Sequence, residues 1–146
     1  MLLSREKSQV LIVDVQDRLL NAIHGADRVI DRCVCLVLAA RKLGIPITMS
    51  EQYPQGLGPT HDSVRDAFAN DGFVADKTEF SCMRNDMLRD RLHALRREGR
   101  SQVVVGGIEA HVCVNQTAMD LESQGFEAFV VADAVGSRAK TSCKLA

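Results

Sequence analysis

Short, continuous runs of apolar and β-branched residues recur along this chain and constrain its fold most strongly. They lie at Gln9–Val15 (QVLIVDV), Ser101–Gly107 (SQVVVGG) and Phe126–Ala132 (FEAFVVA). A strand with one solvent face alternates apolar and polar residues, whereas a continuous apolar run is typical of a strand buried on both faces of a parallel sheet. These runs therefore predict strands of a parallel sheet.

Segments with helical spacing separate the predicted strands. Asp27–Leu43 carries apolar residues at helical spacing, and Gly44 follows as a C-terminal stop before strand character resumes at Ile45–Met49. Two further helices and one further strand are predicted at Asp86–Arg97, Val112–Gln124 and Phe73–Asp76. Strands and helices alternate without repeats or a linker. We therefore expect one domain over residues 1–146, a three-layer α/β/α fold with an open parallel sheet of Rossmann-like topology.

The composition excludes several classes of protein. The chain has 146 residues with 46% apolar content, enough for folding to bury about 70% of the unfolded surface. Its 18 basic and 19 acidic residues give a formal net charge of −1 without a long basic run, so we expect no nucleic-acid partner. No apolar run approaches the roughly 20 residues that a membrane helix needs, and the first residues alternate charge too early for a signal peptide. We expect a cytoplasmic protein without a membrane partner.

The five cysteines are odd in number and form no CxxC pair. Neither a disulfide framework nor a zinc site is indicated, and reduced thiols fit this pattern best. The chain also lacks the GxGxxG, GxxxxGK[ST], GxSxG and HExxH motifs, so dinucleotide-binding, P-loop, serine-hydrolase and zincin functions have no direct support.

Chemically active residues follow several of the predicted strands. In an open parallel sheet, ligands bind beyond the carboxyl ends of the strands. Asp14 lies at the end of the first run, Lys77 lies just past Phe73–Asp76, and Gly106–Cys113 lies where a strand turns into a helix. A carboxylate among aliphatic residues is costly unless it is paired or protonated, so Asp14 is either a functional group or a cap of the following loop. Lys77, taken alone, fits a solvated surface lysine.

Cys113 opens a predicted helix directly after Gly106 and Gly107. Backbone N–H groups and the helix dipole there favour an anion, so the pKa of the thiol is expected to be lowered, and the same groups could hold an oxyanion. The alternative for a lone cysteine in an apolar context is core packing. His111 is a poor candidate for its base, because residues two apart on a helix do not face each other.

The segment Ser50–His61 holds prolines and glycines and is expected to be a loop that follows a strand. Tyr53, Leu57 and His61 in this loop, together with Gln16 after Asp14, are candidates for lining a substrate pocket. The alternative is a plain surface Ω-loop.

Together the segments LIVDVQ, KTEFS, VVVGGIEAHVCVNQTAMDL and FVVADAVGSR resemble the isochorismatase-like, or cysteine hydrolase, superfamily over nearly the whole chain. SEQYPQGLGPT and GIEAHVCV are most similar to the branch of isochorismatase domain-containing proteins. The resemblance implies a catalytic triad of Asp14, Lys77 and Cys113. In such a triad Asp14 takes the thiol proton, Lys77 holds both charges in place and favours thiolate, Cys113 attacks an electrophilic carbon, and water releases the acyl enzyme.

The resemblance also implies a cis peptide between Ile108 and Glu109, with backbone N–H groups near Ala110 and Cys113 forming an oxyanion hole. Members of the superfamily usually continue beyond the last residues of this chain into further elements, so we expect the C-terminal part of the fold to be missing. They are commonly oligomeric, which implies a homo-oligomer of two or more copies.

The nicotinamidases of the superfamily carry an Asp/His/His metal site in the loop after the second strand. This loop offers Glu51, Gln52 and a single His61 instead, so we expect neither a metal nor another cofactor.

The leading hypothesis is a cofactor-free cysteine hydrolase that cleaves a C–N bond of a small amide or imide through an acyl-enzyme on Cys113. One alternative is a catalytically silent binding or interaction module with the same fold. Another is an isochorismatase-type vinyl-ether hydrolase, although those enzymes lack the nucleophilic cysteine. A third is a thiol redox sensor that pairs Cys113 with Cys82 or Cys143.

Overall fold

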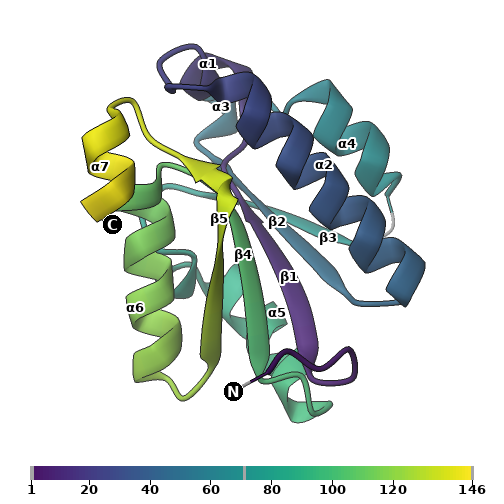
Figure 1. The fold of residues 1–146 in the computed structure, drawn as a ribbon. Coiled ribbons are helices and arrows are strands. Elements are labelled where there is room, and N and C mark those ends of the chain that lie inside the picture. Colours follow the sequence, from purple (N-terminus) through teal and green to yellow (C-terminus); the bar gives the residue numbers. More distant parts are fainter. Residues whose placement is uncertain (1, 71, 146) are drawn as a thin grey trace.

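A computed structural model describes residues 2–70 and 72–145 and contains a five-stranded sheet with helices on both faces (Figure 1). The strands are β1 (Ser8–Val13), β2 (Ile47–Gln52), β3 (Phe73–Lys77), β4 (Gln102–Ile108) and β5 (Glu127–Gly136). They lie in the order β3-β2-β1-β4-β5, and every neighbouring pair is parallel. This arrangement confirms the predicted α/β class.

Strands β2 and β3 follow β1 on one side of the sheet, whereas β4 and β5 lie on the other side of β1. The direction in which strands are added thus reverses between β1 and β4, which are the most deeply buried strands. Every residue of both strands is buried, as their continuous apolar runs predict. Gly107, with a φ of 122°, allows the two strands to lie close together, because a Cβ there would lie 2.1 Å from the carbonyl oxygen of Val13. The carboxyl ends of β1 and β4 therefore form the switch point at which open α/β sheets bind ligands.

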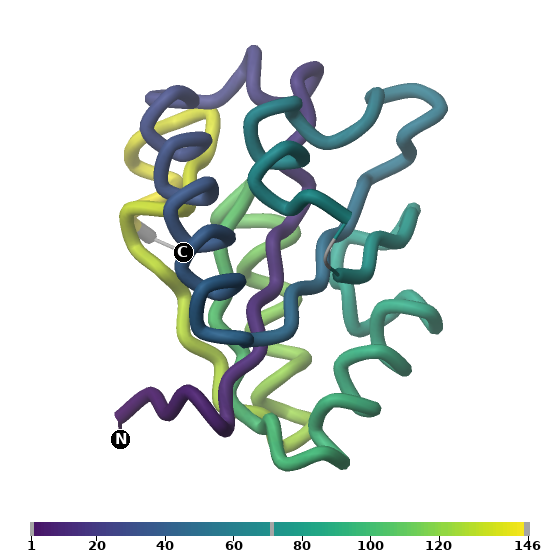
Figure 2. The backbone as a smooth tube through the Cα atoms, turned by 90° about the vertical axis from the view of Figure 1, so that its right-hand side faces the viewer, coloured from purple at the N-terminus to yellow at the C-terminus, as the bar shows by residue number. Residues whose placement is uncertain are grey.

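Two helical layers cover the sheet. Helices α2 (Ala26–Leu43) and α4 (Asp62–Phe68) pack on one face, whereas α5 (Asp86–Arg97) and α6 (Asn115–Ser123) pack on the other (Figure 1). The remaining helical elements are short and comprise α1 (Asp17–Leu20), α3 (Pro54–Leu57), a 3₁₀ turn (Cys82–Arg84), a π-helical turn (Ala110–Val114) and α7 (Lys140–Leu145). Figure 2 shows that the segments after β1 and β2 lie at the opposite end of the molecule from the N-terminal segment.

The segment Ser50–His61 is more regular than its composition predicts. Strand β2 continues to Gln52 because this residue pairs with Lys77 of β3, and Pro54 begins the short helix α3. The helices α1 and α4 were not expected, because each is too short to show a helical period in the sequence. The helix predicted from Val112 begins earlier, as a π-helical turn at Ala110. No helix within the described residues is long and apolar enough to cross a membrane.

A buried thiol in α2 predicts a loss of stability at high pH. Cys33 is fully buried and donates its thiol to the carbonyl oxygen of Ala134 at 3.4 Å. Burial, with a smaller contribution from the charge of Asp133, raises the pKa of Cys33 to about 12. The unfolded chain ionises this thiol near the ordinary pKa of about 8.5, so only the folded state keeps the proton above that pH. The stabilising contribution is complete below about pH 8.5 and is lost as the pH rises through the raised pKa.

Urea unfolding at about pH 8 and about pH 10 measures this contribution. We expect the unfolding free energy of the wild type to fall with a slope that includes up to about 1.4 kcal/mol per pH unit from Cys33. The Cys33→Ala variant should show a shallower fall, while a variant at the exposed neighbour, Cys35→Ala, should parallel the wild type. Equal slopes in all three proteins would contradict the raised pKa.

Candidate active site

Asp14 lies at the switch point, directly after β1. Its backbone has a φ of 52°, in the left-handed region that aspartate tolerates better than most residues, and its side chain is fully buried. The backbone N–H of Asp14 donates to the carbonyl oxygen of Ser50 at 3.1 Å, and the Ser50 hydroxyl donates to Asp14 Oδ1 at 2.7 Å. The adjacent strand β2 thus fixes both the backbone and the carboxylate of Asp14.

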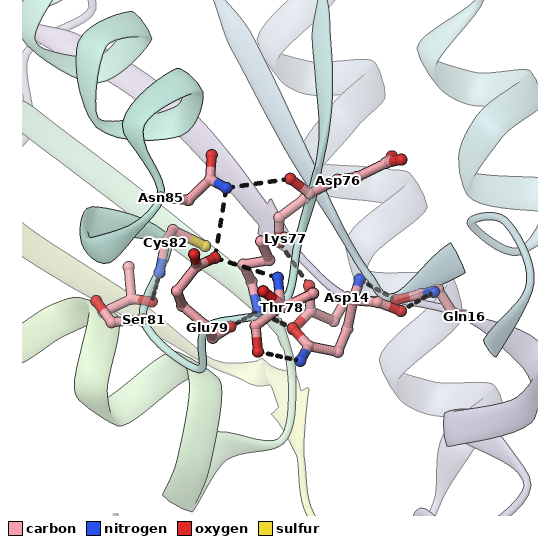
Figure 3. A network of polar contacts seen from close by, with 12 residues as sticks. Asp14, Gln16, Asp76, Lys77, Thr78, Glu79, Ser81, Cys82 and Asn85 are labelled. Carbon is pink, nitrogen blue, oxygen red and sulfur yellow. Dashed lines mark hydrogen bonds and ion pairs between the residues drawn. The ribbon is translucent and has the colours of Figure 1, made fainter. Parts of the chain in front are cut away.

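Lys77, the last residue of β3, forms a buried ion pair with Asp14 (Figure 3). Lys77 Nζ donates to Asp14 Oδ2 at 2.7 Å, and both side chains have 0% exposure. The solvated surface position that Lys77 suggests when taken alone is therefore wrong. A charge so deeply buried requires a partner of opposite sign, which Asp14 supplies.

The ammonium of Lys77 has two further acceptors. Lys77 Nζ donates to Gln52 Oε1 at 2.7 Å and to the carbonyl oxygen of Glu79 at 3.0 Å. Burial alone would lower the pKa of Lys77, but the charge of Asp14, the neighbouring Cys82 and Cys113, and the hydrogen bond to Asp14 together outweigh burial, and the pKa is raised. Lys77 is thus a permanent positive charge within the site.

Cys113 lies in the π-helical turn that follows β4, and its thiol is close enough to Asp14 and Lys77 for both charges to act on its pKa. Burial and the charge of Asp14 raise the pKa of Cys113 to about 12, although Lys77 acts in the opposite direction. This is the reverse of the lowered pKa expected from the sequence. The physical reason is that the thiol is buried beside a carboxylate, which opposes the thiolate more strongly than Lys77 favours it.

Asp14, Lys77 and Cys113, which come from three different strand ends, therefore meet in one place. At rest the site holds a neutral thiol next to a carboxylate and an ammonium. A carboxylate in this position can accept the thiol proton, and the thiolate formed in this way is a strong nucleophile.

The backbone beside Cys113 is held in a defined arrangement. The peptide bond between Ile108 and Glu109 is cis, which is the geometry that the family resemblance implied. The carbonyl oxygen of Glu109 accepts hydrogen bonds from the N–H groups of Val112 at 3.1 Å and Val114 at 3.2 Å.

The N–H groups of Ala110 and Cys113 are those assigned by the resemblance to an oxyanion hole. In the part of the chain that the structure describes, no acceptor outside the turn takes either of them. The N–H of Ala110 stands at the start of the turn, where a helical N–H has no acceptor within the helix.

A cavity of about 260 Å³ opens beside Cys113. Its walls are mostly apolar, and the lining residues are Leu19, Gln52, Leu57, Phe80, Ile108, Glu109, Val112, Cys113 and Arg138. Glu109 and Arg138 form an ion pair at 2.7 Å, and the guanidinium of Arg138 lowers the pKa of Glu109. The cavity wall thus combines apolar side chains with the neutral carboxamide of Gln52 and the paired charges of Glu109 and Arg138.

The four residues predicted to line a substrate pocket have different positions. Leu57 lines the cavity beside Cys113, whereas Tyr53 lines a separate hollow above Lys77. His61 caps α4 by accepting a hydrogen bond from the N–H of Ser63. Gln16 is fully buried, and its side-chain amide donates to the carbonyl oxygens of Gln52, the last residue of β2, and Gly58.

The sequence did not point to Gln52, Phe80 or Arg138 as pocket residues. In the sequence, Gln52 is notable only because it does not match the metal site of the nicotinamidases. Its position opposite Lys77 follows from the parallel pairing of β2 and β3. Phe80 and Arg138 lie in irregular segments that carry no periodic signal. Among residues 2–70 and 72–145, no group of three or more His, Cys, Asp or Glu side chains is arranged to hold a metal ion.

The fold and the site define an α/β protein with a buried Asp-Lys-Cys arrangement at its switch point. The sequence matches the family described as "Isochorismatase domain" over residues 8–146. The chain belongs to the isochorismatase family, a family of hydrolase-like proteins.

Curated relatives include isochorismatase domain-containing proteins of Danio rerio. The chain is 41% identical to protein 1 over 138 residues, which cover 93% of this chain and 46% of that protein. It is 37% identical to protein 2 over 139 residues, covering 95% of this chain and 68% of that protein. The chain therefore spans about half the length of the first relative and about two thirds of the second.

Solved structures share the same fold. The structure described as MAR1 ribonuclease from Caenorhabditis elegans has a TM-score of 0.89 and 36% identity, covering 98% of this chain and 71% of that one. The YcaC gene product of Escherichia coli, described as an octameric hydrolase of unknown specificity, has a TM-score of 0.87 and 23% identity, covering 98% and 70%. The second likeness concerns the fold alone.

Proposed function

We propose that this protein is a cysteine hydrolase that needs no cofactor and cleaves a C–N bond of a small amide or imide. One observation carries the proposal: the buried ion pair of Asp14 and Lys77 lies beside the thiol of Cys113, which opens onto a cavity at the switch point. The thiol, its base and the charge that orients the base are thus neighbours in one site.

The reaction begins when the Cys113 thiol transfers its proton to Asp14 and the sulfur attacks the carbonyl carbon of the bound amide. The resulting oxyanion is held by the N–H groups of Ala110 and Cys113. Asp14 then gives the proton to the departing nitrogen, which leaves as ammonia or an amine, and the acyl group remains on Cys113 as a thioester. Asp14 next takes a proton from water, and the hydroxide attacks the carbonyl carbon of the thioester. The C–S bond breaks, the acid leaves, and Asp14 returns its proton to the sulfur of Cys113.

Lys77 keeps its proton throughout this cycle. Its raised pKa makes it a constant positive charge that stabilises the carboxylate of Asp14 and the thiolate of Cys113. The raised pKa of Cys113 means that thiolate forms only when the proton passes to Asp14 with substrate in place. Such a site is protected against unspecific alkylation at rest.

The cavity limits the size and the character of the substrate. Its volume of about 260 Å³ lies just below the range of about 300–1,000 Å³ that is usual for drug-sized ligands. Leucine, isoleucine, valine and phenylalanine side chains form much of its wall. These features favour a small amide or imide with an apolar body.

A panel of small carboxamides, cyclic imides and ureas tests the proposal by the release of ammonia or amine and of the matching acid. We expect turnover of a subset with compact apolar bodies. Saturable binding of such compounds without product from any of them would support the catalytically silent binding module instead. Cleavage of a vinyl ether but of no amide would support the isochorismatase-type reaction.

The similar structure from Caenorhabditis elegans is described as a ribonuclease, so RNA is a second candidate substrate to test. We expect no cleavage of single-stranded RNA by this chain, because its formal net charge of −1 supplies little attraction for a phosphate backbone. An RNA cleavage assay with the wild type and the Cys113→Ala variant checks this expectation. Cleavage that is lost in the variant would contradict it.

We also propose that the protein works in the cytoplasm as a homo-oligomer of two or more copies. All five cysteines are free thiols, which is typical of a reducing compartment. Within residues 2–70 and 72–145, strand β5 pairs only with β4, and the exposed fraction of Val130 is 44%; a strand edge without a partner favours association. The molar mass from light scattering tests the oligomer, and the mass of a single chain would contradict it.

A further inference from the structure

Gln52 connects the buried ion pair with the cavity. Its side-chain oxygen accepts a hydrogen bond from Lys77 Nζ at 2.7 Å, and its side-chain nitrogen donates to the carbonyl oxygen of Thr78 at 3.1 Å. The same side chain lines the cavity together with Cys113. Gln52 is therefore a residue that a bound substrate can reach and that also touches the charged group behind the nucleophile.

The hydrogen bonds of Lys77 are fully used at rest. An ammonium has three N–H donors, and those of Lys77 go to Asp14 Oδ2, Gln52 Oε1 and the carbonyl oxygen of Glu79. No donor is left for the sulfur of Cys113, so Lys77 acts on the thiol only through its charge. A direct N–H bond to the thiolate requires that one of the three acceptors be released.

Gln52 is the acceptor that is most readily released. The carboxylate of Asp14 is fully buried, and the carbonyl oxygen of Glu79 belongs to the main chain. The Gln52 side chain, in contrast, is neutral and half-buried, and its backbone is fixed independently by Gln16, which donates to the Gln52 carbonyl oxygen at 2.9 Å and accepts from its N–H at 2.7 Å. The side chain can turn without disturbing the strand.

We propose that Gln52 is a positioning residue that holds Lys77 away from Cys113 in the resting site and releases one of its N–H groups to the thiolate when an amide occupies the cavity. An amide substrate presents its own N–H and carbonyl groups, which compete for the hydrogen bonds of the Gln52 carboxamide. Occupation of the cavity thus activates the nucleophile. This inference rests on the proposed function, because it takes Cys113 as the nucleophile.

The test is the alkylation rate of Cys113 by iodoacetamide, measured by peptide mass spectrometry at about pH 8 without substrate. The Gln52→Met variant keeps the length of the side chain and the backbone bonds to Gln16 but offers Lys77 no oxygen. We expect Cys113 to react about tenfold faster than in the wild type, which corresponds to a thiol pKa lower by about one unit. A merely structural role of Gln52 would leave this rate unchanged or reduce it.

Two variants serve as controls. Gln52→Glu keeps an acceptor for Lys77 and adds a negative charge beside the thiol, so it should not accelerate alkylation. Gln55→Met makes the same substitution at an exposed position of the same segment and should react like the wild type. Circular dichroism confirms that each variant is folded, and Gln52→Leu, with the same expected acceleration, replaces Gln52→Met if that variant fails to fold.

The outcomes separate this inference from the proposed function. The role of Gln52 is overturned if Cys113 in Gln52→Met or Gln52→Leu is alkylated at the wild-type rate or more slowly. In that case Lys77→Met still slows alkylation of Cys113. If Lys77→Met leaves the Cys113 rate unchanged, the coupling of Lys77 to the thiol is absent, and the proposed function fails with it.

Discussion

Replacing Lys77 with methionine is expected to lower the free energy of unfolding by about 3–5 kcal/mol and to reduce amide hydrolysis to the background rate. The change leaves the carboxylate of Asp14 fully buried without the ammonium that neutralises it at 2.7 Å. Breaking one half of a buried ion pair is much more costly than removing both charges. Urea unfolding and the hydrolysis assay measure the two effects.

A second substitution separates stability from catalysis. The double variant with Lys77→Met and Asp14→Asn removes both charges, so we expect it to recover part of the lost stability. It should remain inactive, because the proton acceptor for Cys113 is also gone. If the free energy of unfolding of Lys77→Met falls by less than about 1 kcal/mol, the effect is that of a surface ion pair. Such a result would contradict the buried ion pair.

Replacing Cys113 with alanine is expected to reduce amide hydrolysis by about a thousandfold or more. The thiol is the only group beside the cavity that forms the acyl intermediate in the proposed mechanism, and the remaining site can only bind the substrate. The hydrolysis rate at saturating substrate measures this effect. Stability should change little, because the substitution removes a single sulfur atom.

Cys35→Ala provides the matched control, since Cys35 is an exposed cysteine of α2. Its hydrolysis rate should equal that of the wild type. Undiminished hydrolysis in Cys113→Ala would show that the nucleophile lies elsewhere. A specific disulfide of Cys113 with Cys82 or Cys143 after mild peroxide, without hydrolysis by the reduced protein, would favour the redox sensor.

The sheet was predictable because its signal is local. The continuous apolar runs around Leu11 and Val104 mark strands that are buried on both faces, and alternation with helices dictates parallel pairing. The short helices α1, α3 and α4 were missed, since elements of four to seven residues carry less than two helical turns of pattern. Their formation depends on capping and tertiary contacts, as at His61.

The chemistry of the site was only partly predictable. The rule that ligands bind at the carboxyl ends of strands correctly placed Asp14, Lys77 and Cys113 on one edge. The burial of Lys77 was not readable from its polar neighbours in the sequence, because it depends on the pairing of β3 with β2. The pKa of Cys113 went in the opposite direction to the prediction, because its distance from Asp14 is a property of the folded chain.

The pocket residues were the least predictable part. Gln16 and His61 are polar and close to the site in sequence, yet the first holds the backbone at the end of β2 and at Gly58, and the second caps a helix. Gln52 and Arg138 line the cavity from segments far apart in the chain. Which polar side chain faces a cavity depends on contacts between such segments, and no spacing within one segment encodes it.

The most direct test of a covalent role for Cys113 is rapid acid quenching during turnover of a hydrolysed amide, followed by peptide mass spectrometry. Cys113, Asp14 and Lys77 acting as a unit predict an acyl group on the peptide that contains Cys113, with a mass equal to the acid product less water. The adduct should be absent from Asp14→Asn, in which the thiol has no proton acceptor. Turnover at the full rate with unmodified Cys113 at every quench time, and the same turnover in Cys113→Ala, would contradict the account.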